Sequence, residues 1–210
     1  RWDTTPGLVM LLGPARTALS LYLSLCVSSS TLQLQGGKGG MARCWLLKSE
    51  PHEYGIDHLQ AQKVGRWDGI RNFQARNSLR EMSVDDVAYF YHSSCKQPGI
   101  YGRMTIAKTH YDDPTALDTA SPYYFPKATP ESNPWSSVDV AFACRYSAPL
   151  LLPRIKELSL GACPLVSKGS RLSVMPITPE QWEVLEGELR QLNEQQGQEQ
   201  QGQEQQGQEQ

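Results

Sequence analysis

The chain has 210 residues, a formal net charge of −2 and five cysteines. Residues 41–193 carry 17 basic and 17 acidic side chains, so they lack the basic surplus needed for broad, sequence-independent binding to phosphate backbones. The cysteines form no C-x-x-C pair and have no histidine pair at zinc spacing, which argues against a zinc site and a disulfide scaffold. We expect reduced, mostly buried thiols in an intracellular protein.

Residues 1–40 do not have the pattern of a folded core. The apolar stretch "LVMLLGPARTALSLYLSLCV" is interrupted by Gly13, Pro14 and Arg16, which argues against a membrane-spanning helix of about 20 residues. The segment is poor in acidic residues and rich in serine near its end. This is typical of an organelle transit peptide or a signal sequence, and equally of non-coding sequence translated upstream of Met41. We expect a disordered leader.

Residues 41–193 have the pattern of one mixed domain dominated by strands. Runs of β-branched and aromatic residues predict five strands, at residues 44–48, 87–92, 100–109, 138–146 and 171–177. Helices are fewer, near residues 72–82, 153–158 and 179–192. Several short strands with few helices predict an α+β fold, a small and partly open β-barrel flanked or plugged by helices.

The helix at residues 179–192 has clear start signals. Thr178 is a good N-cap, Pro179 occupies the first helical position, and Gln181 completes a capping box. After it, "QGQEQ" occurs three times in tandem up to Gln210. A Gln/Gly/Glu repeat has nothing apolar to bury, so we expect residues 194–210 to form a disordered low-complexity tail.

The familiar catalytic motifs are missing from the sequence. It contains no G-x-S-x-G, no Walker-type loop, no G-x-G-x-x-G and no H-E-x-x-H. The adjacent pair Asp85-Asp86 diverges on either a strand or a helix, so a turn that enters the next strand is its expected role. We expect a non-catalytic protein with no cofactor and no metal.

The segment "RWDGIRNFQARNSLREM", residues 66–82, concentrates planar hydrogen-bond donors. It holds four arginines, two asparagines, a glutamine and a tryptophan, and no lysine. Trp67-Asp68-Gly69 resembles a turn, and Asn72 can cap a helix on which Asn72, Arg76 and Arg80 share one face. Planar guanidinium and amide groups match the edges of a base. A solvated helix face or a structural network remains the alternative.

Three other segments place a hydroxyl or a cation at the end of a predicted strand. They are "KSEP" (48–51), "YHSS" (91–94) and "RLS" (171–173). The mouth of a barrel would gather such strand ends into one site. Trp67 and Trp135 lie in polar, turn-like contexts, which makes both candidates for stacking on a flat ring.

The ordered motifs "WLLKSEP", "WDGIRNFQARN", "FYHS", "GIYG" and "RLSV" together resemble the EVE domain family, and within it the thymocyte nuclear protein type. The resemblance runs from about Trp45 to Trp182. It implies a PUA-like fold, a twisted, partly open β-barrel with short flanking helices. It also implies a relation to YTH and other PUA-like proteins that hold a modified base in a pocket, and for this type a methylated or oxidised cytosine in DNA.

Carried over residue by residue, the resemblance assigns ligand-binding roles along the whole domain. With the stacking candidates above, the expected ligand-binding residues are Lys48, Ser49, Trp67, Arg71, Asn72, Gln74, Arg76, Asn77, Tyr91, Ser93, Trp135, Arg171 and Ser173. Two positions depart from the family pattern. Asp85-Asp86 replaces the usual Gly-Asp, and Tyr101 replaces a small aliphatic residue.

The resulting hypothesis is a binding module that reads a modified base, with modified cytosine in DNA favoured over RNA. It implies a nuclear protein that does not enter a membrane, or a mitochondrial or plastid one if residues 1–40 are a genuine transit peptide. One alternative is an enzyme acting on nucleic acid on the same fold, with Lys48, His92 or Glu50 as acid–base groups. The other is a protein-interaction module in which the arginine-rich helix is structural.

Overall fold

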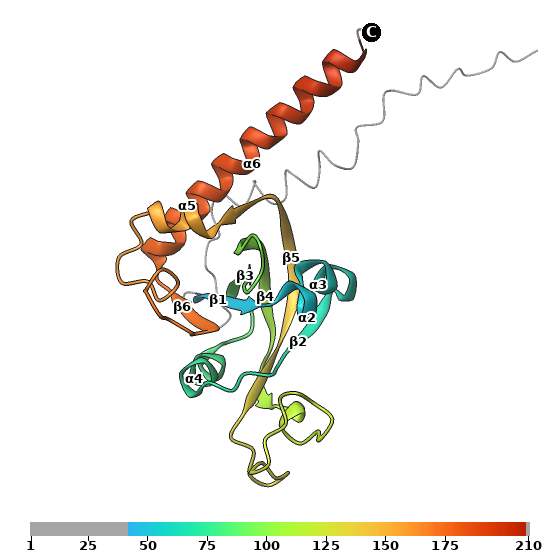
Figure 1. Ribbon diagram of the computed structural model, residues 1–210, viewed down its shortest axis with the longest axis vertical. Coiled ribbons are helices and arrows are strands. Elements are labelled where there is room, and N and C mark those ends of the chain that lie inside the picture. Colours follow the sequence, from blue (N-terminus) through green and yellow to red (C-terminus); the bar gives the residue numbers. More distant parts are fainter. Residues whose placement is uncertain (1–41, 209–210) are drawn as a thin grey trace, which may run out of the picture. The chain divides into compact units, whose positions relative to one another are not determined.

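The computed structural model describes residues 42–208, with the side chains of residues 42–200, so the expected leader and the last two tail residues lie outside the described residues. Within this part the strands form one six-stranded sheet in the order β2-β5-β4-β3-β1-β6 (Figure 1). Its strands are β1 (Cys44–Ser49), β2 (Val64–Trp67), β3 (Val87–His92), β4 (Gly99–Asp112), β5 (Ser136–Leu151) and β6 (Val174–Ile177). The β1–β3 pair is parallel and the other four pairs are antiparallel.

The helices are short, with one exception. They are α2 (Pro51–Tyr54), α3 (Ile56–Gln62), α4 (Phe73–Glu81), α5 (Leu152–Glu157) and α6 (Pro179–Gln208), with a 3-10 turn at Pro114–Ala116. The predicted α+β class is confirmed. The edge strands β2 and β6 do not pair with each other in the part of the chain that is described, so the curved sheet stays open.

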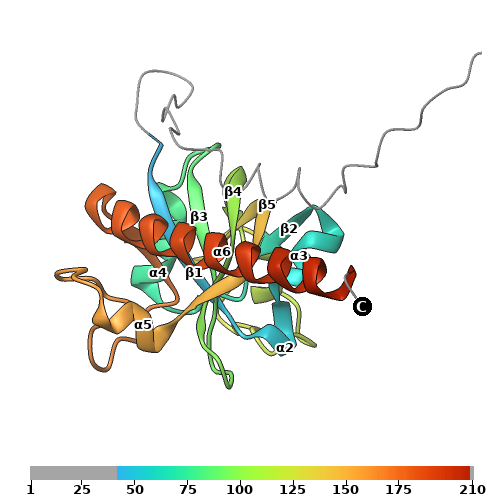
Figure 2. The ribbon, with the colours of Figure 1, turned by 90° about the horizontal axis from the view of Figure 1, so that it is seen from above.

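Strand β3 lies at the centre of the core because β1 and β4 flank it. All six of its residues are buried, as expected for a strand covered on both faces. Strand β5 buries Val138, Val140 and Cys144, following the alternation in its sequence. Helix α6 packs across β3 and β5, where Trp182 stacks on Tyr89 at 4.2 Å between ring centroids (Figure 2).

Two local predictions are confirmed by hydrogen bonds. Asp86 is buried in the turn before β3, and its carboxylate accepts from the Arg43 and Ser83 backbone N–H groups and from Trp45 Nε1. The predicted capping box also forms, since the Thr178 and Gln181 side chains each accept from the other residue's backbone N–H.

The sequence patterns missed β2, α2 and α3 and misjudged the length of α6. Strand β2 has only four residues, too few for a clear alternating pattern. The repeat after residue 193 continues α6 as far as Gln208 instead of losing regular structure. Glutamine and glutamate form helices readily, and extending an anchored helix avoids the unfavourable nucleation step. No helix among residues 42–208 combines the length and apolar character needed to cross a membrane.

Candidate functional site

Strand ends far apart in sequence surround a cavity of about 900 Å³. Its lining comes from the end of β1, the residues after β3, residues 170–173 before β6, and residues 66–72 between β2 and α4, with α2, α3 and Tyr123 completing it. Backbone hydrogen bonds hold the strand ends together: Lys48 N donates to Ser173 O at 2.7 Å, and Ser93 N donates to Ser49 O at 2.8 Å. The strand ends singled out in the sequence therefore meet in space.

One side of the cavity, here called the donor wall, carries cations and hydroxyls. Its members are Lys48, Ser49, Ser93, Arg171 and Ser173. Neither Lys48 nor Arg171 forms an ion pair with any residue described by the structure. Burial lowers the pKa of Lys48, and its Nζ lies 5.6 Å from the centroid of the Tyr91 ring. Cations without ionic partners favour an anionic or strongly polar ligand here.

A second part of the lining, here called the loop wall, is formed by residues 67–72. Trp67 is only 4% exposed, because Phe90 and Tyr54 pack against it edge-on, with ring centroids 5.2 and 6.1 Å away. The Oδ1 atom of Asn72 caps α4 by accepting from Ala75 N at 3.0 Å. Its Nδ2 has no hydrogen-bond acceptor among the described residues, so this amide can donate to a ligand.

Arg71 braces the loop wall. Its Nε and Nη atoms donate to the carbonyls of Tyr123 and Ile70, to Asp113 Oδ2 at 2.7 Å and to Thr115 Oγ1 at 3.0 Å. These bonds occupy the five N–H groups of a guanidinium, so all the donors of Arg71 are used within the protein. Asp113 is fully buried and also accepts from Gly69 N at 3.1 Å.

The two aspartates beside this brace differ in their pKa shifts. Burial raises the pKa of Asp113, but hydrogen bonds from Arg71 and Thr115 outweigh it and leave the pKa below its usual value. The pKa of Asp68 is raised, by burial first and then by Asp113, against the opposing effects of Arg66 and Arg71. The fold thus stabilises the charge on Asp113 and disfavours the charge on Asp68.

Helix α4 is fastened to the start of β5. Arg76 Nη1 and Arg80 Nη2 donate to Pro134 O at 3.1 and 3.2 Å, and Arg80 Nε donates to Ser136 Oγ at 2.9 Å. Arg76 also donates to Asn77 Oδ1. The face of the helix predicted to read a base is therefore largely a structural network.

Five of the residues expected at the site lie outside the cavity lining: Gln74, Arg76, Asn77, Tyr91 and Trp135. Trp135 is 3% exposed and stacks on Phe73 at 4.9 Å between ring centroids, so its polar sequence context concealed a core position. Tyr91 is likewise 3% exposed, on the central strand β3. Lys48, Ser49, Trp67, Arg71, Asn72, Ser93, Arg171 and Ser173 do line the cavity.

Several lining residues were not predicted. They include Glu50, Glu53, Tyr54, Gln62, Arg66, Asp68 and Tyr123. Glu50 belongs to "KSEP" and Asp68 to "WDG", so their positions beside predicted residues were the available signal. Tyr123 comes from the long connection between β4 and β5 and had no local signal.

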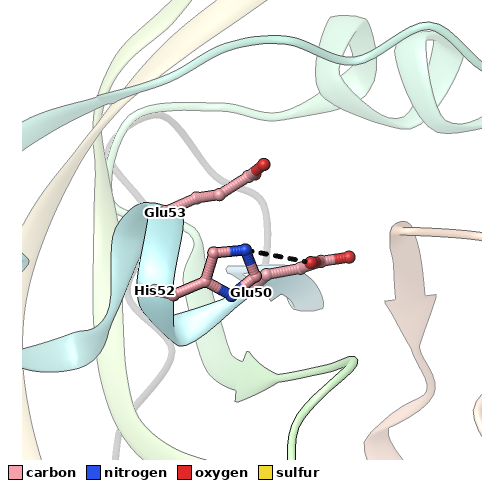
Figure 3. Close-up of side chains that lie close together, drawn as sticks. All are labelled: Glu50, His52 and Glu53. Atoms are coloured by element: carbon pink, nitrogen blue, oxygen red, sulfur yellow. Dashed lines mark ion pairs between the residues drawn. The ribbon is translucent and has the colours of Figure 1, made fainter.

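Glu50, His52 and Glu53 gather at the start of α2, with ligand-type atoms within 4.8 Å of one another. His52 Nε2 lies 3.6 Å from Glu50 Oε2, while Glu53 accepts a hydrogen bond from the Tyr123 hydroxyl at 2.9 Å. Figure 3 shows the His52 ring beside Glu50, with the Glu53 side chain above the ring. Since Glu50 and Glu53 line the cavity, they give it an acidic edge.

Comparison with known proteins shows the family. A family profile described as the EVE domain matches residues 43–188, which include the whole sheet and the cavity lining. The chain belongs to the EVE domain family. The resemblance expected from the "KSEP" and "WDGIRNFQARN" motifs is therefore confirmed.

Individual relatives agree with this assignment. Thymocyte nuclear protein 1 of Mus musculus is 35% identical over 195 residues, which cover 81% of this chain and 85% of the relative. The crystal structure of a protein from Pseudomonas putida is 55% identical and has a TM-score of 0.68, covering 70% of this chain and 99% of that one. The human THYN1 protein, in complex with DNA containing 5-methylcytosine, is 36% identical with a TM-score of 0.64, covering 70% of this chain and 98% of that one.

Proposed function

We propose that this EVE domain is a DNA-binding module that holds a methylated cytosine in the cavity between the strand ends. The carrying observation is the cavity itself, of about 900 Å³, whose lining combines Trp67 and the Asn72 amide with Lys48 and Arg171, two cations that have no ionic partner among the described residues. That volume falls within the range typical of small-molecule sites. The human THYN1 complex with 5-methylcytosine DNA, on the same fold, supports methylated cytosine as the ligand class.

A base enters such a cavity only after leaving the duplex. Extruding the base requires a few kcal/mol for unstacking and unpairing. Contacts inside the cavity therefore have to contribute at least that much binding free energy. Lys48 and Arg171 on the donor wall suit the phosphates on either side of the base, because both are without ionic partners among residues 42–200. Two local cations make this compatible with a domain of balanced charge.

The proposed role is non-catalytic and nuclear. Of the three acid–base candidates, His92 is directed away, because its Nε2 accepts from the Ile56 backbone N–H at 3.1 Å. Lys48 and Glu50 remain at the cavity, without a nucleophile–base pair among the hydrogen bonds of the described residues. The thymocyte nuclear protein relatives support a nuclear location.

The experiment is a binding titration of the whole chain at fixed, moderate salt. Matched oligonucleotides carry cytosine, 5-methylcytosine, 5-hydroxymethylcytosine, adenine or N6-methyladenine at one position. A preference for 5-methylcytosine over cytosine of about tenfold, roughly 1.4 kcal/mol, supports the proposal. Equal, weak and salt-sensitive binding to every oligonucleotide would overturn it, because this is the behaviour of non-specific phosphate contacts.

A further inference from the structure

A protein that reads 5-methylcytosine must also reject thymine. The two bases share the pyrimidine ring and the 5-methyl group, and they differ where cytosine has an N4 amino donor and thymine an O4 acceptor. An apolar recess for the methyl group would accept both. Thymine occurs in every A·T pair, so a reader needs a group that penalises the wrong base.

The cavity offers three carboxylates as acceptors for an amino group: Glu50, Glu53 and Asp68. Glu53 already accepts from the Tyr123 hydroxyl, and Glu50 lies beside His52 on the acidic edge. Asp68 receives no hydrogen bond from another described residue, and its nearest cation is Arg66 at 3.9 Å. Asp68 and Glu50 therefore both lack a hydrogen bond from another described residue, and Asp68 is the one that belongs to the loop wall, directly after Trp67.

The position of Asp68 suits a reading group. It directly follows Trp67, which is buried against the core. It directly precedes Gly69, whose N–H is held by Asp113. Gly69 has a φ of +71°, and a Cβ there would lie 2.9 Å from the Tyr123 ring, so only glycine fits this turn. The carboxylate is therefore presented from a rigid loop wall, as precise recognition requires.

The surroundings leave this carboxylate short of stabilising contacts. Its side chain is 32% exposed, and burial together with Asp113 raises its pKa. A ligand that donates a hydrogen bond here relieves this unfavourable environment, while one that presents an oxygen worsens it. At position 4 of the ring, 5-methylcytosine presents an amino group and thymine presents a carbonyl oxygen.

We propose that the Asp68 carboxylate accepts a hydrogen bond from the N4 amino group of the extruded 5-methylcytosine and thereby excludes thymine. This inference rests on the proposed function and names the residue that determines its specificity.

The test compares the whole chain with the Asp68→Asn variant on DNA duplexes whose target base faces an abasic site. Cytosine, 5-methylcytosine and thymine are then all unpaired, so the cost of extrusion is similar for each. Asp85→Asn, in the exposed turn before β3, is the control that loses the same charge outside the cavity. Glu50→Gln tests the competing acceptor inside the cavity. Thermal melting of each variant verifies folding.

The wild-type chain is expected to prefer 5-methylcytosine over thymine by about tenfold or more, the usual scale for one good polar base contact. In Asp68→Asn this ratio is expected to fall to about one or to invert, since a carboxamide can donate to thymine O4. The Asp85→Asn control is expected to keep the wild-type ratio.

The outcomes separate the two proposals. If wild-type protein prefers 5-methylcytosine over cytosine but Asp68→Asn keeps the wild-type ratio of 5-methylcytosine to thymine, the Asp68 inference is wrong and the proposed function stands. Loss of that ratio in Glu50→Gln instead would assign the reading group to Glu50. If wild-type protein does not distinguish 5-methylcytosine from cytosine, the proposed function fails and the inference falls with it.

Discussion

Two polar parts of the molecule, the segment of residues 66–82 and the donor wall, use their side chains in opposite ways. Residues 66–82 hold four arginines. The guanidinium groups of Arg71, Arg76 and Arg80 donate hydrogen bonds to protein groups, including Asp113, Pro134 O and Ser136. The donor wall has far fewer polar groups, but Lys48 and Arg171 find no ionic partner among the described residues.

The difference shows that a high density of donors in a sequence does not by itself mark a ligand site. Loops that cross a sheet edge leave backbone carbonyls, such as those of Pro134 and Tyr123, which need partners when they are shielded from water. Arginine can satisfy several of them at once. The groups available to a ligand are those that the fold leaves unsatisfied, and at this cavity they come from sparse positions at strand ends.

The largest expected effect comes from breaking the brace. Asp113→Ala removes the buried partner of Arg71 and the acceptor for Gly69 N. Removing one member of a buried ion pair costs about 3–5 kcal/mol, so we expect chemical denaturation to show a loss of that size in the free energy of unfolding. Asp112→Ala, next to it but exposed, is the control and should change stability little. Equal effects of the two substitutions would contradict the brace.

An intermediate effect is expected on the donor wall. Lys48→Met removes a cation without an ionic partner from the described cavity. We expect binding to 5-methylcytosine DNA to weaken about tenfold, roughly 1.4 kcal/mol, and the slope of log affinity against log salt to decrease by about one. Stability should not fall, because burial already disfavours the charge on Lys48 and lowers its pKa.

The matched control for Lys48→Met is Lys156→Met, which removes an exposed lysine from α5, outside the cavity lining. If both substitutions weaken binding equally, the donor wall has no special role and the contrast between the two regions disappears.

The smallest effect is expected at Asp68, where the contribution to the free energy of unfolding changes with pH in a predictable direction. Its raised pKa means that ionisation opposes folding above the folded-state pKa and has no effect well below the unfolded value of about 3.9. The free energy of unfolding of Asp68→Asn at pH 7 should therefore be about 0.5–1 kcal/mol higher than that of the wild type, as is common when a functional group is removed. The gain should decrease as the pH falls through the folded-state pKa and vanish well below the unfolded value of about 3.9.

Asp113 provides the opposite case. Its lowered pKa stabilises the fold above the unfolded value of about 3.9, and this contribution is lost as the pH falls through the folded-state pKa. Urea denaturation of the wild type and of the Asp68→Asn and Asp113→Ala variants at a series of pH values measures the contribution of each aspartate. A pH dependence of the same sign for the two aspartates would contradict the difference between them.

The sequence by itself determined the class of the domain, its family and most of its strands. Long runs such as "VAYFYH" and "VDVAFACRY" carry their own pattern of burial, because side chains alternate along a strand whatever surrounds it. Capping at Thr178 and Asn72 was equally readable, since a cap depends on residues three positions apart.

Only the tertiary structure decided which polar side chains serve the fold and which face the cavity. Arg71 bonds to residues more than 40 positions away, at Asp113 and Tyr123, and no local pattern announces those partners. The same holds for Trp135, which lies in a polar stretch yet stacks on Phe73, and for Asp68, whose pKa is raised by burial and then by Asp113. Periodicity records local geometry, whereas hydrogen-bond partners and burial arise from contacts between distant segments.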